Sequence, residues 1–349
     1  LMDKIYPALF EGSQYASRLP IGKKEIIEGA PHNAIKRFYT DWYRPDLMAF
    51  VVVGDLDPDT VEKAIRDHFI QLKNPANPRP RNAIPVPDQP GTKALVFSDK
   101  EMPVVQIAIF NKVQPRKEEL QKDYRAMLAY QLLTGMFTQR LNELREQPDP
   151  PVVGAQVAYG SMVPEQSIFQ MMAVVPEKGI ERGVETLITE SERAVRFGFT
   201  EGELSRQKKE YLAMMENAYN ERDKTLSASL AAEYLRNFLT GEPIPGIEFE
   251  FDFARKYLEG ITLEEVNEIL RRNFTQDNRL VVVLAPQKEG MQLPDEPMVL
   301  KSVELAAGSN ITPYQDKMAG NQLLRDVPKK GRILLTKKNE SLGVVEMKL

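Results

Sequence analysis

Residues 30–72 constrain the fold most, because their apolar pattern predicts a helix, a strand and a second helix in direct succession. Aromatic and aliphatic side chains recur at helical spacing over residues 35–42. Pro45 then ends the helix, since the residue before a proline is disfavoured in the helical region. Residues 47–53 form a continuous, valine-rich apolar run that is too short to cross a membrane. Such a run is typical of a strand at the centre of a sheet, so the unit predicts an α+β fold.

Capping residues mark where three helices are expected to begin. Asp57 is placed to cap the helix that follows the apolar run, with Pro58 in its first position, where a missing N–H costs no hydrogen bond. Two capping boxes, in which a threonine and a glutamate three residues later satisfy each other's backbone N–H groups, follow farther along. They are Thr200-x-x-Glu203 and Thr262-x-x-Glu265.

Beyond residue 91 the chain alternates between strand and helix patterns. Period-two or continuous apolar runs predict strands at residues 93–98, 104–111, 152–161, 166–175 and 280–285. A period of 3.6 predicts helices at residues 116–147, 180–197, 200–238, 249–258 and 263–273. The order of helix, polar break and valine-rich strand at residues 266–284 repeats that at residues 35–53, which suggests a duplicated α+β domain.

Length and proline content predict the domain limits. A chain of 349 residues, 42% hydrophobic and 28% charged, is long enough for about two globular domains. Residues 73–91 contain six prolines and are expected to form a stiff connector. The expected parts are the end of a first domain (1–72), this connector (73–91), a second α+β domain (92–285), a linker (286–330) and the start of a third domain (331–349). The chain begins without a cap or a signal pattern, so it is expected to be part of a longer protein.

Charge and composition exclude several classes of function. The net charge is −4, and lysine and arginine alternate with acidic residues, so no nucleic-acid partner is expected. No apolar run approaches ~18 residues, so no membrane span is predicted. The chain has no cysteine, which excludes disulfides, zinc ribbons and thiol catalysis.

The histidine content argues against a metal site within the chain. The two histidines, His32 and His68, lie on different predicted elements and have no partner histidine four residues away. His68 falls on the apolar face of its predicted helix and is expected to be a core residue rather than a ligand. A catalytic zinc site keeps three protein ligands, so we expect this chain to bind no stoichiometric zinc and to cleave nothing by itself.

One predicted strand, residues 152–161, has an unusual composition. Its larger side chains point to one face, whereas Gly154, Ala158 and Gly160 leave the other face nearly bare. Glycines weaken a strand, and close approach of another backbone or a ligand is a common reason for them. A β-bulge or crowding under a helix is the alternative explanation.

Several motifs resemble the pitrilysin/insulysin-type (inverzincin) zinc metallopeptidases. They are Tyr15-x-Ser-Arg-x-Pro-Ile-Gly, Phe38-Tyr39-x-x-Trp42-Tyr43-x-Pro45-x-x-Met48, residues 51–57, and Phe137-Thr-Gln-Arg-Leu141-x-x-x-Leu144-Arg145-Glu146 before a β-hairpin. The resemblance covers about residues 5–285 and implies duplicated α+β domains, each a mostly antiparallel sheet flanked by helices, as in metallopeptidase-like LuxS/MPP-type folds. Residues 327–349 resemble the start of the next homologous half.

The family's zinc motif is the main departure. Members hold zinc with an inverted His-x-x-Glu-His helix and a later glutamate, and this motif is absent from the chain. The resemblance therefore implies zinc in a parent protein. It implies no catalytic or metal-binding residue in this chain. It implies a wall of a peptide-binding chamber in a periplasmic or cytoplasmic endopeptidase, completed by domains upstream and downstream. The residues that match the family's substrate-anchoring strand are Val157, Ala158, Tyr159, Gly160 and Ser161.

A second class of function stays open. Non-catalytic relatives of such peptidases act as scaffolds or substrate holders, as in processing-peptidase partner subunits and the core subunits of cytochrome bc complexes. We favour the peptidase, because residues 331–349 resemble the beginning of a second half within one long polypeptide.

Overall fold

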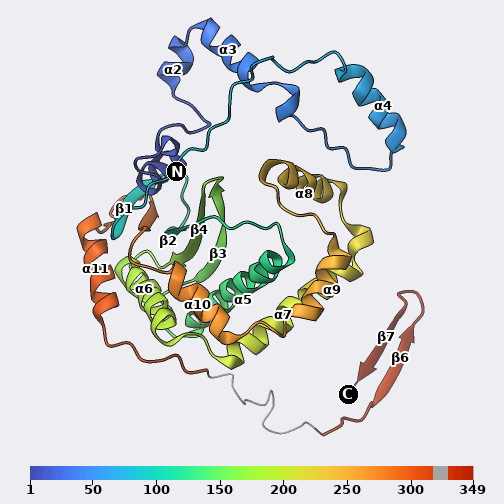
Figure 1. Ribbon diagram of the computed structural model, residues 1–349. Helices are drawn as coiled ribbons and strands as arrows, with labels where there is room; N and C mark the ends of the chain where they lie inside the picture. The colour runs from blue at the N-terminus through green and yellow to red at the C-terminus, as the bar shows by residue number, and fades with distance from the viewer. Residues whose placement is uncertain (317–328, 349) are drawn as a thin grey trace. The chain divides into compact units, whose positions relative to one another are not determined.

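The computed structural model describes residues 1–316 and 329–348 and divides into two compact units, residues 1–314 and 315–349 (Figure 1). The helices of the first unit are α1 (Met2–Leu9), α2 (Lys24–Gly29), α3 (His32–Trp42), α4 (Pro58–Phe69), α5 (Gln121–Glu143), α6 (Ile180–Phe197), α7 (Glu201–Asn220), α8 (Ser227–Thr240), α9 (Ile247–Tyr257), α10 (Leu263–Asn273) and α11 (Glu296–Gly308). Its strands are β1 (Thr92–Asp99), β2 (Val105–Val113), β3 (Gly154–Val163), β4 (Gln166–Val175) and β5 (Arg279–Pro286). Within the described part of the chain, no helix has the length and apolar character needed to cross a bilayer.

The five strands form one mixed sheet in the order β1-β5-β2-β4-β3. β5 pairs in parallel with β1, and the β5–β2, β2–β4 and β4–β3 pairs are antiparallel. A tight turn joins β1 to β2, but β5 lies between them, so the last strand of this unit in the sequence is inserted between its first two. This topology leaves β3 at one edge and confirms the α+β class.

Each face of the sheet is covered by a separate apolar cluster. Alternate residues of the strands, such as Ile107 and Val283, pack against α5, α6, α10 and α11. The opposite alternation, which includes Phe110 and Val282, packs against α1 and the residues that follow it. Because successive strand residues point to opposite faces, the interior strand β5 is buried on both faces, which explains its continuous run of apolar residues.

The capping signals are confirmed. Asp57 accepts hydrogen bonds from the N–H groups of Asp59 (2.9 Å) and Thr60 (3.2 Å) at the start of α4. Both capping boxes form, at the starts of α7 and α10. Local side-chain-to-backbone bonding needs no tertiary information, which is why these helix starts could be predicted closely.

The helix expected over residues 200–238 is wrong in its extent. α7 ends at Asn220, a 3₁₀ turn follows at Arg222–Lys224, and α8 starts separately at Ser227. Residues 220–225 contain no apolar side chain that could hold a continuous helix against the core. Helical stability comes mostly from packing of an apolar face, so the polar segment is where the helix divides.

The strand expected at residues 47–53 is also wrong within the described structure. These residues form no strand, and Met48, Phe50 and Val52 are exposed. A strand needs a neighbour to take its backbone hydrogen bonds, and the two sheets of the described chain offer it none. The first copy of the suggested repeat therefore lacks its strand here, whereas the second is present as α10 and β5.

Two further sequence expectations differ from the structure. The segment 286–330, expected to be a linker, contains α11, whose Val299 and Val303 are buried against the core; Asp295 caps this helix by accepting a hydrogen bond from the Met298 N–H (2.8 Å). Residues 317–328 of that segment lie outside the described residues. His68 is exposed rather than buried, because α4 contributes no residue to either core cluster.

The second unit contains a two-stranded antiparallel hairpin, β6 (Leu335–Asn339) and β7 (Val344–Lys348). Leu349 lies outside the described residues. Nearly every residue of the hairpin is exposed.

Candidate peptide-binding edge

Strand β3 carries the candidate site because it lies at the edge of the sheet. It pairs with β4 from Gly154 to Ser161, with an irregular register between Ser161 and Val163. No other strand of the described chain pairs with its second side. An edge strand presents N–H and C=O groups that another chain can bond, so the occupancy of these groups decides what β3 can bind.

Helix α5 occupies the first part of this edge. The side chain of Asn142 accepts a hydrogen bond from the Ala155 N–H (3.2 Å) and donates one to the Ala155 carbonyl (2.9 Å). Thr138 does the same for Val157, accepting from its N–H (2.9 Å) and donating to its carbonyl (3.4 Å). Because Thr138 and Asn142 are four residues apart, both point from the same side of the helix. Together they replace the hydrogen bonds of a missing neighbour strand.

The second part of the edge is open. Outward-facing backbone groups alternate along an antiparallel edge strand, so after Ala155 and Val157 the next residues that face outward are Tyr159 and Ser161. Within the described residues, neither backbone has a hydrogen bond beyond those of the β3–β4 ladder. Tyr159 and Ser161 are therefore the two residues of the regular β3–β4 ladder whose outward N–H and C=O groups can bond another chain.

The side chains of β3 leave the open part accessible from one face. A Cβ atom added at Gly154 or Gly160 would meet nothing within 4 Å. Ala158, Gly160, Met162 and their neighbours on β4 line a pocket of about 200 Å³. This bare face agrees with the sequence pattern, and it results from small side chains rather than from crowding under a helix.

Tyr159 holds the strand from the opposite face. Its ring contacts those of Tyr130 (4.6 Å between centroids) and Phe169 (5.0 Å). Burial raises the pKa of the Tyr159 hydroxyl, so this side chain stays neutral over the physiological range. The guanidinium of Arg116 lies over the ring of Tyr130 at 4.2 Å. The aromatic cluster therefore supports the free segment without covering its edge.

A groove of about 400 Å³ lies between α5 and α7. It begins beside Val157, whose backbone is bonded to Thr138 of α5. Gly135 forms part of its floor, and a Cβ atom there would lie 2.4 Å from the Gln207 side chain. The lining is rich in amide side chains, including Gln131, Gln139, Gln156 and Gln207, and Glu210 is the one charged residue among its described members. On the α7 wall, burial and the nearby Glu250 raise the pKa of Tyr211 to about 12.

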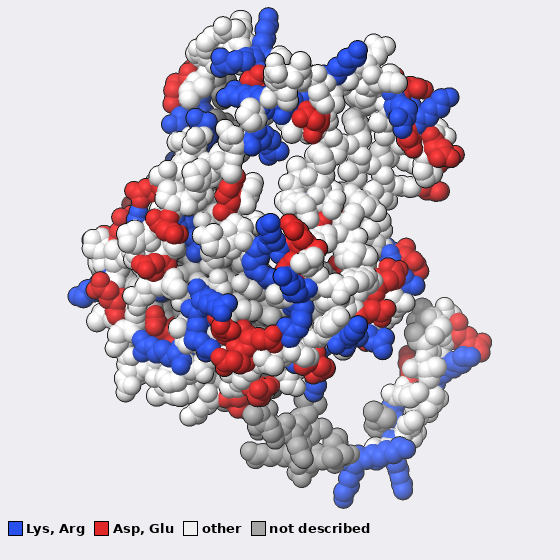
Figure 2. All heavy atoms as spheres, viewed as in Figure 1, with Lys and Arg blue, Asp and Glu red and all other residues white. Residues whose placement is uncertain are grey.

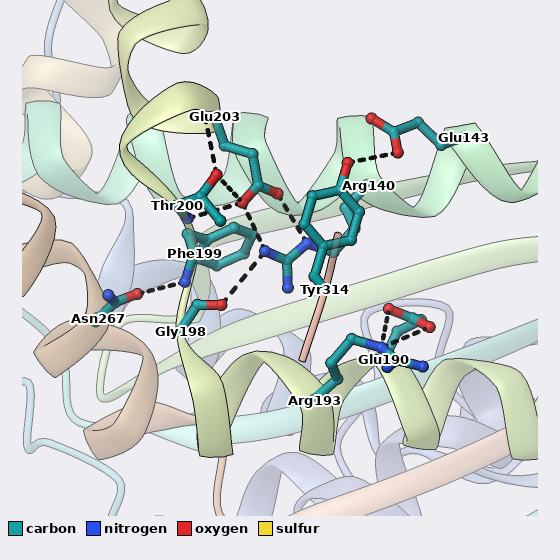
Figure 3. Close-up of polar contacts among 10 residues, drawn as sticks. All are labelled: Arg140, Glu143, Glu190, Arg193, Gly198, Phe199, Thr200, Glu203, Asn267 and Tyr314. Atoms are coloured by element: carbon teal, nitrogen blue, oxygen red, sulfur yellow. Dashed lines mark hydrogen bonds and ion pairs between the residues drawn. The ribbon is translucent and has the colours of Figure 1, made fainter. Parts of the chain in front are cut away.

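A buried ion pair fixes the position of α5 (Figure 3). Arg140 donates from Nε to Glu203 Oε1 (2.8 Å) and from Nη2 to Glu203 Oε2 (2.7 Å). Its guanidinium is flanked by the rings of Phe199 and Tyr314, each centred 4.2 Å away. Tyr314 also donates a hydrogen bond to Glu143 (2.7 Å). Arg140 lies between Thr138 and Asn142 in sequence, so these contacts hold the helix from which both caps extend.

No described group in the chain fits a zinc ion. His32 and His68 are exposed on α3 and α4, and among the described residues no three His, Cys, Asp or Glu side chains converge as a metal site would require. On the face drawn in Figure 2, acidic and basic side chains are interspersed.

The five residues expected to bind substrate divide into two groups. Ala158, Tyr159, Gly160 and Ser161 belong to the open segment, whereas Val157 has a buried side chain and a backbone bonded to Thr138. Thr138 and Asn142, which bond the edge of β3, were not among the residues predicted from the sequence. Their spacing of four on one helix was the available signal, but it could not show that they face a strand edge.

Comparison with known proteins identifies the family. Residues 30–211 match the model of the peptidase M16 inactive domain. The chain belongs to the peptidase M16 family. It is 28% identical over its whole length to a zinc protease PQQL-like protein of Arabidopsis thaliana, of which it covers 34%. It is 24% identical over 75% of its length to the probable zinc protease PqqL of Escherichia coli, of which it covers 28%. This M16 chain thus spans about a third of the length of these curated relatives.

Solved structures show the same fold. The first half of the periplasmic protease PqqL from Escherichia coli superposes with a TM-score of 0.79 at 18% identity, over 90% of this M16 chain and 68% of that one. At this identity the likeness concerns the fold, and it confirms the α+β architecture of M16 domains expected from the sequence. The family model that matches residues 30–211 describes an inactive domain.

Proposed function

We propose that this chain is a non-catalytic part of a zinc endopeptidase and that it holds peptide substrate on the free edge of β3. The curated relatives that match it are named zinc proteases and are about three times as long. This supports a parent protein in which one part binds the metal and another part, this chain, holds the peptide. Zinc and the residues that bind it then belong to other parts of the parent protein.

The open backbone of Tyr159 and Ser161 is the observation that carries this proposal. Main-chain hydrogen bonding on a sheet edge gives affinity with little dependence on sequence, as a peptidase acting on varied substrates requires. The bare face at Gly160 and the pocket of about 200 Å³ leave room for the side chains of a bound peptide. In the parent protein, β3 would form part of the chamber wall.

Exposed apolar side chains on α2, on α3 and in residues 48–53 support the proposed domain limits. Ile26, Ile35, Phe38 and Phe50 are exposed, and no residue of α2, α3 or α4 is buried. Large exposed apolar surfaces mark sites of contact. We assign residues 1–72 to the end of a preceding domain whose sheet would receive residues 47–53 as a strand, with α1 and the residues after it reaching over one face of the present sheet. We assign residues 331–349 to the start of a third domain.

A scaffold role without any peptidase activity in the parent is less well supported. The relatives that match most of this chain by sequence are named zinc proteases.

Binding of a labelled peptide tests the proposal. The chain of residues 1–349 is titrated against a fluorescein-labelled, unstructured 14-residue peptide of Ser, Thr, Val, Ala and Lys, with fluorescence anisotropy as the readout. Replacing Gly160 with valine fills the open face and should weaken binding about tenfold, the equivalent of one or two lost hydrogen bonds.

Two comparisons complete this test. Gly160→Val should leave the urea unfolding midpoint almost unchanged, whereas Tyr159→Ala should lower the free energy of unfolding by about 2 kcal/mol, because it truncates a half-buried aromatic ring. Equal affinity of the wild type and Gly160→Val would refute the β3 edge as the binding surface. A wild type that binds no peptide would refute the proposed function as a whole.

A further inference from the structure

We infer that β3 accepts only two residues of edge pairing and that the bound peptide then leaves the edge and enters the groove between α5 and α7, where a basic side chain is favoured. This inference rests on the proposed function and adds the register, the path and the side-chain class of the peptide.

We call Tyr159 and Ser161 the pairing window, and α5 prevents pairing on its upstream side. Asn142 and Thr138 satisfy both backbone groups of Ala155 and Val157. Neighbouring strands lie about 4.8 Å apart, and α5 side chains already fill that space beside these two residues. A peptide strand therefore cannot pair upstream of Tyr159.

The window is closed on its other side by the shape of β3 itself. The pairing with β4 shifts register between Ser161 and Val163, and such an irregularity twists a strand and breaks the alternation of its backbone groups. Beyond it, the turn is held by Glu165, which accepts hydrogen bonds from the Tyr15 hydroxyl (2.6 Å) and the Ile84 N–H (3.2 Å). Only Tyr159 and Ser161 remain for a regular ladder.

The groove gives the peptide a path away from the edge. Gln156 and Val157 lie at its margin, and Thr138 lines it, so it begins where the edge becomes capped. Its amide side chains can donate and accept hydrogen bonds. Of the described residues that line it, Glu210 alone is charged, and a lysine or arginine of the peptide would pair with this carboxylate.

A backbone N-methyl scan of the same 14-residue peptide tests the window. N-methylation removes one N–H donor at a time, so paired amides are revealed by lost affinity. Two amides at alternate positions should each weaken binding about tenfold when methylated, and methylation elsewhere should have little effect. Loss of affinity at three or more alternate positions would overturn the two-residue window while leaving peptide binding by β3 intact.

Variants of Ser161 test the same window from the protein side. Ser161→Pro removes an N–H that faces outward, which an edge strand tolerates, and should reduce peptide affinity about tenfold without lowering the unfolding midpoint. Ser161→Ala keeps the N–H, so it should reduce peptide affinity far less than Ser161→Pro. Equal peptide affinity of Ser161→Pro and Ser161→Ala would overturn the assignment of the Ser161 N–H as a donor to the peptide. If the wild type binds no peptide, the proposed function fails together with this inference.

A charge scan tests the groove. Peptides with Lys or Glu at each position flanking the paired residues are compared, and at one flank the lysine peptide should bind about threefold more tightly, as expected for an exposed ion pair. Glu210→Gln should abolish this difference, whereas Glu216→Gln, an exposed change on the same helix outside the groove, should retain it. Equal affinity of the Lys and Glu peptides, or a preference that survives in Glu210→Gln, would overturn the path through the groove.

Discussion

At the scale of residues, we expect the buried ion pair of Arg140 and Glu203 to contribute strongly to the stability of the fold. Their side chains are 1% and 6% exposed, and Glu203 also completes the capping box of α7. Glu203→Ala would leave the guanidinium buried without its partner, and we expect it to lower the free energy of unfolding by about 3–5 kcal/mol. The measurement is urea unfolding followed by circular dichroism.

An exposed pair provides the matched control. Arg272 and Glu268 form an ion pair on the surface of α10, with side chains 73% and 49% exposed. Glu268→Ala should cost less than about 1 kcal/mol. Similar losses for the two variants would contradict the view that burial determines the value of the Arg140–Glu203 pair.

Glu265 gives the chain a specific dependence on acid. Hydrogen bonding to Arg125 is the main cause that lowers the pKa of this carboxyl to about 2. A lowered folded-state pKa adds stability at neutral pH, and this stability is lost as the pH falls from about 4.5 to about 2. Because the pair is partly exposed, the contribution is about 1 kcal/mol.

A glutamine variant isolates this contribution. Glu265→Gln cannot ionise, so it should be less stable than the wild type at pH 6 and should approach it at pH 2. Unfolding midpoints at the two pH values provide the comparison. A constant difference between the variant and the wild type would show that Glu265 does not titrate as described.

At the scale of elements, Gly183 sets how closely α6 approaches the sheet. A Cβ atom there would lie 2.7 Å from a methyl carbon of Val175 and 2.8 Å from one of Ile107. Gly183→Ala should therefore cost about 1–2 kcal/mol, because overpacking outweighs the better helix propensity of alanine. Gly308→Ala, which meets nothing within 4 Å at the end of α11, should be neutral or stabilising. Thermal unfolding of both variants tests this difference.

The elements also show what the sequence could predict. α6 was expected at residues 180–197 and is found at Ile180–Phe197, since its apolar period and its limits are local features. α11 was missed and residues 47–53 were assigned a strand, because both depend on what lies beside them. At the candidate site, the bare face at Gly154 and Gly160 was visible in the sequence. The caps from Thr138 and Asn142 were not, since they arise only when α5 packs against β3.

At the scale of the whole molecule, this M16 chain should hold no zinc of its own. The full sequence contains two histidines and no cysteine, and a catalytic zinc site needs three protein ligands. Elemental analysis of the purified chain should find far less than one zinc per molecule. One tightly bound zinc per chain would contradict the assignment of the metal to other parts of the parent protein.

Residue-resolved amide hydrogen exchange of the chain, with and without the 14-residue peptide, tests the central claim most directly. If β3 holds peptide on its free edge, the amides of Tyr159 and Ser161 gain protection when the peptide binds, because their N–H groups become hydrogen bonded. The amides of Ala155 and Val157, already bonded to α5, should change little. Peptide binding that leaves the exchange of Tyr159 and Ser161 unchanged would contradict the account.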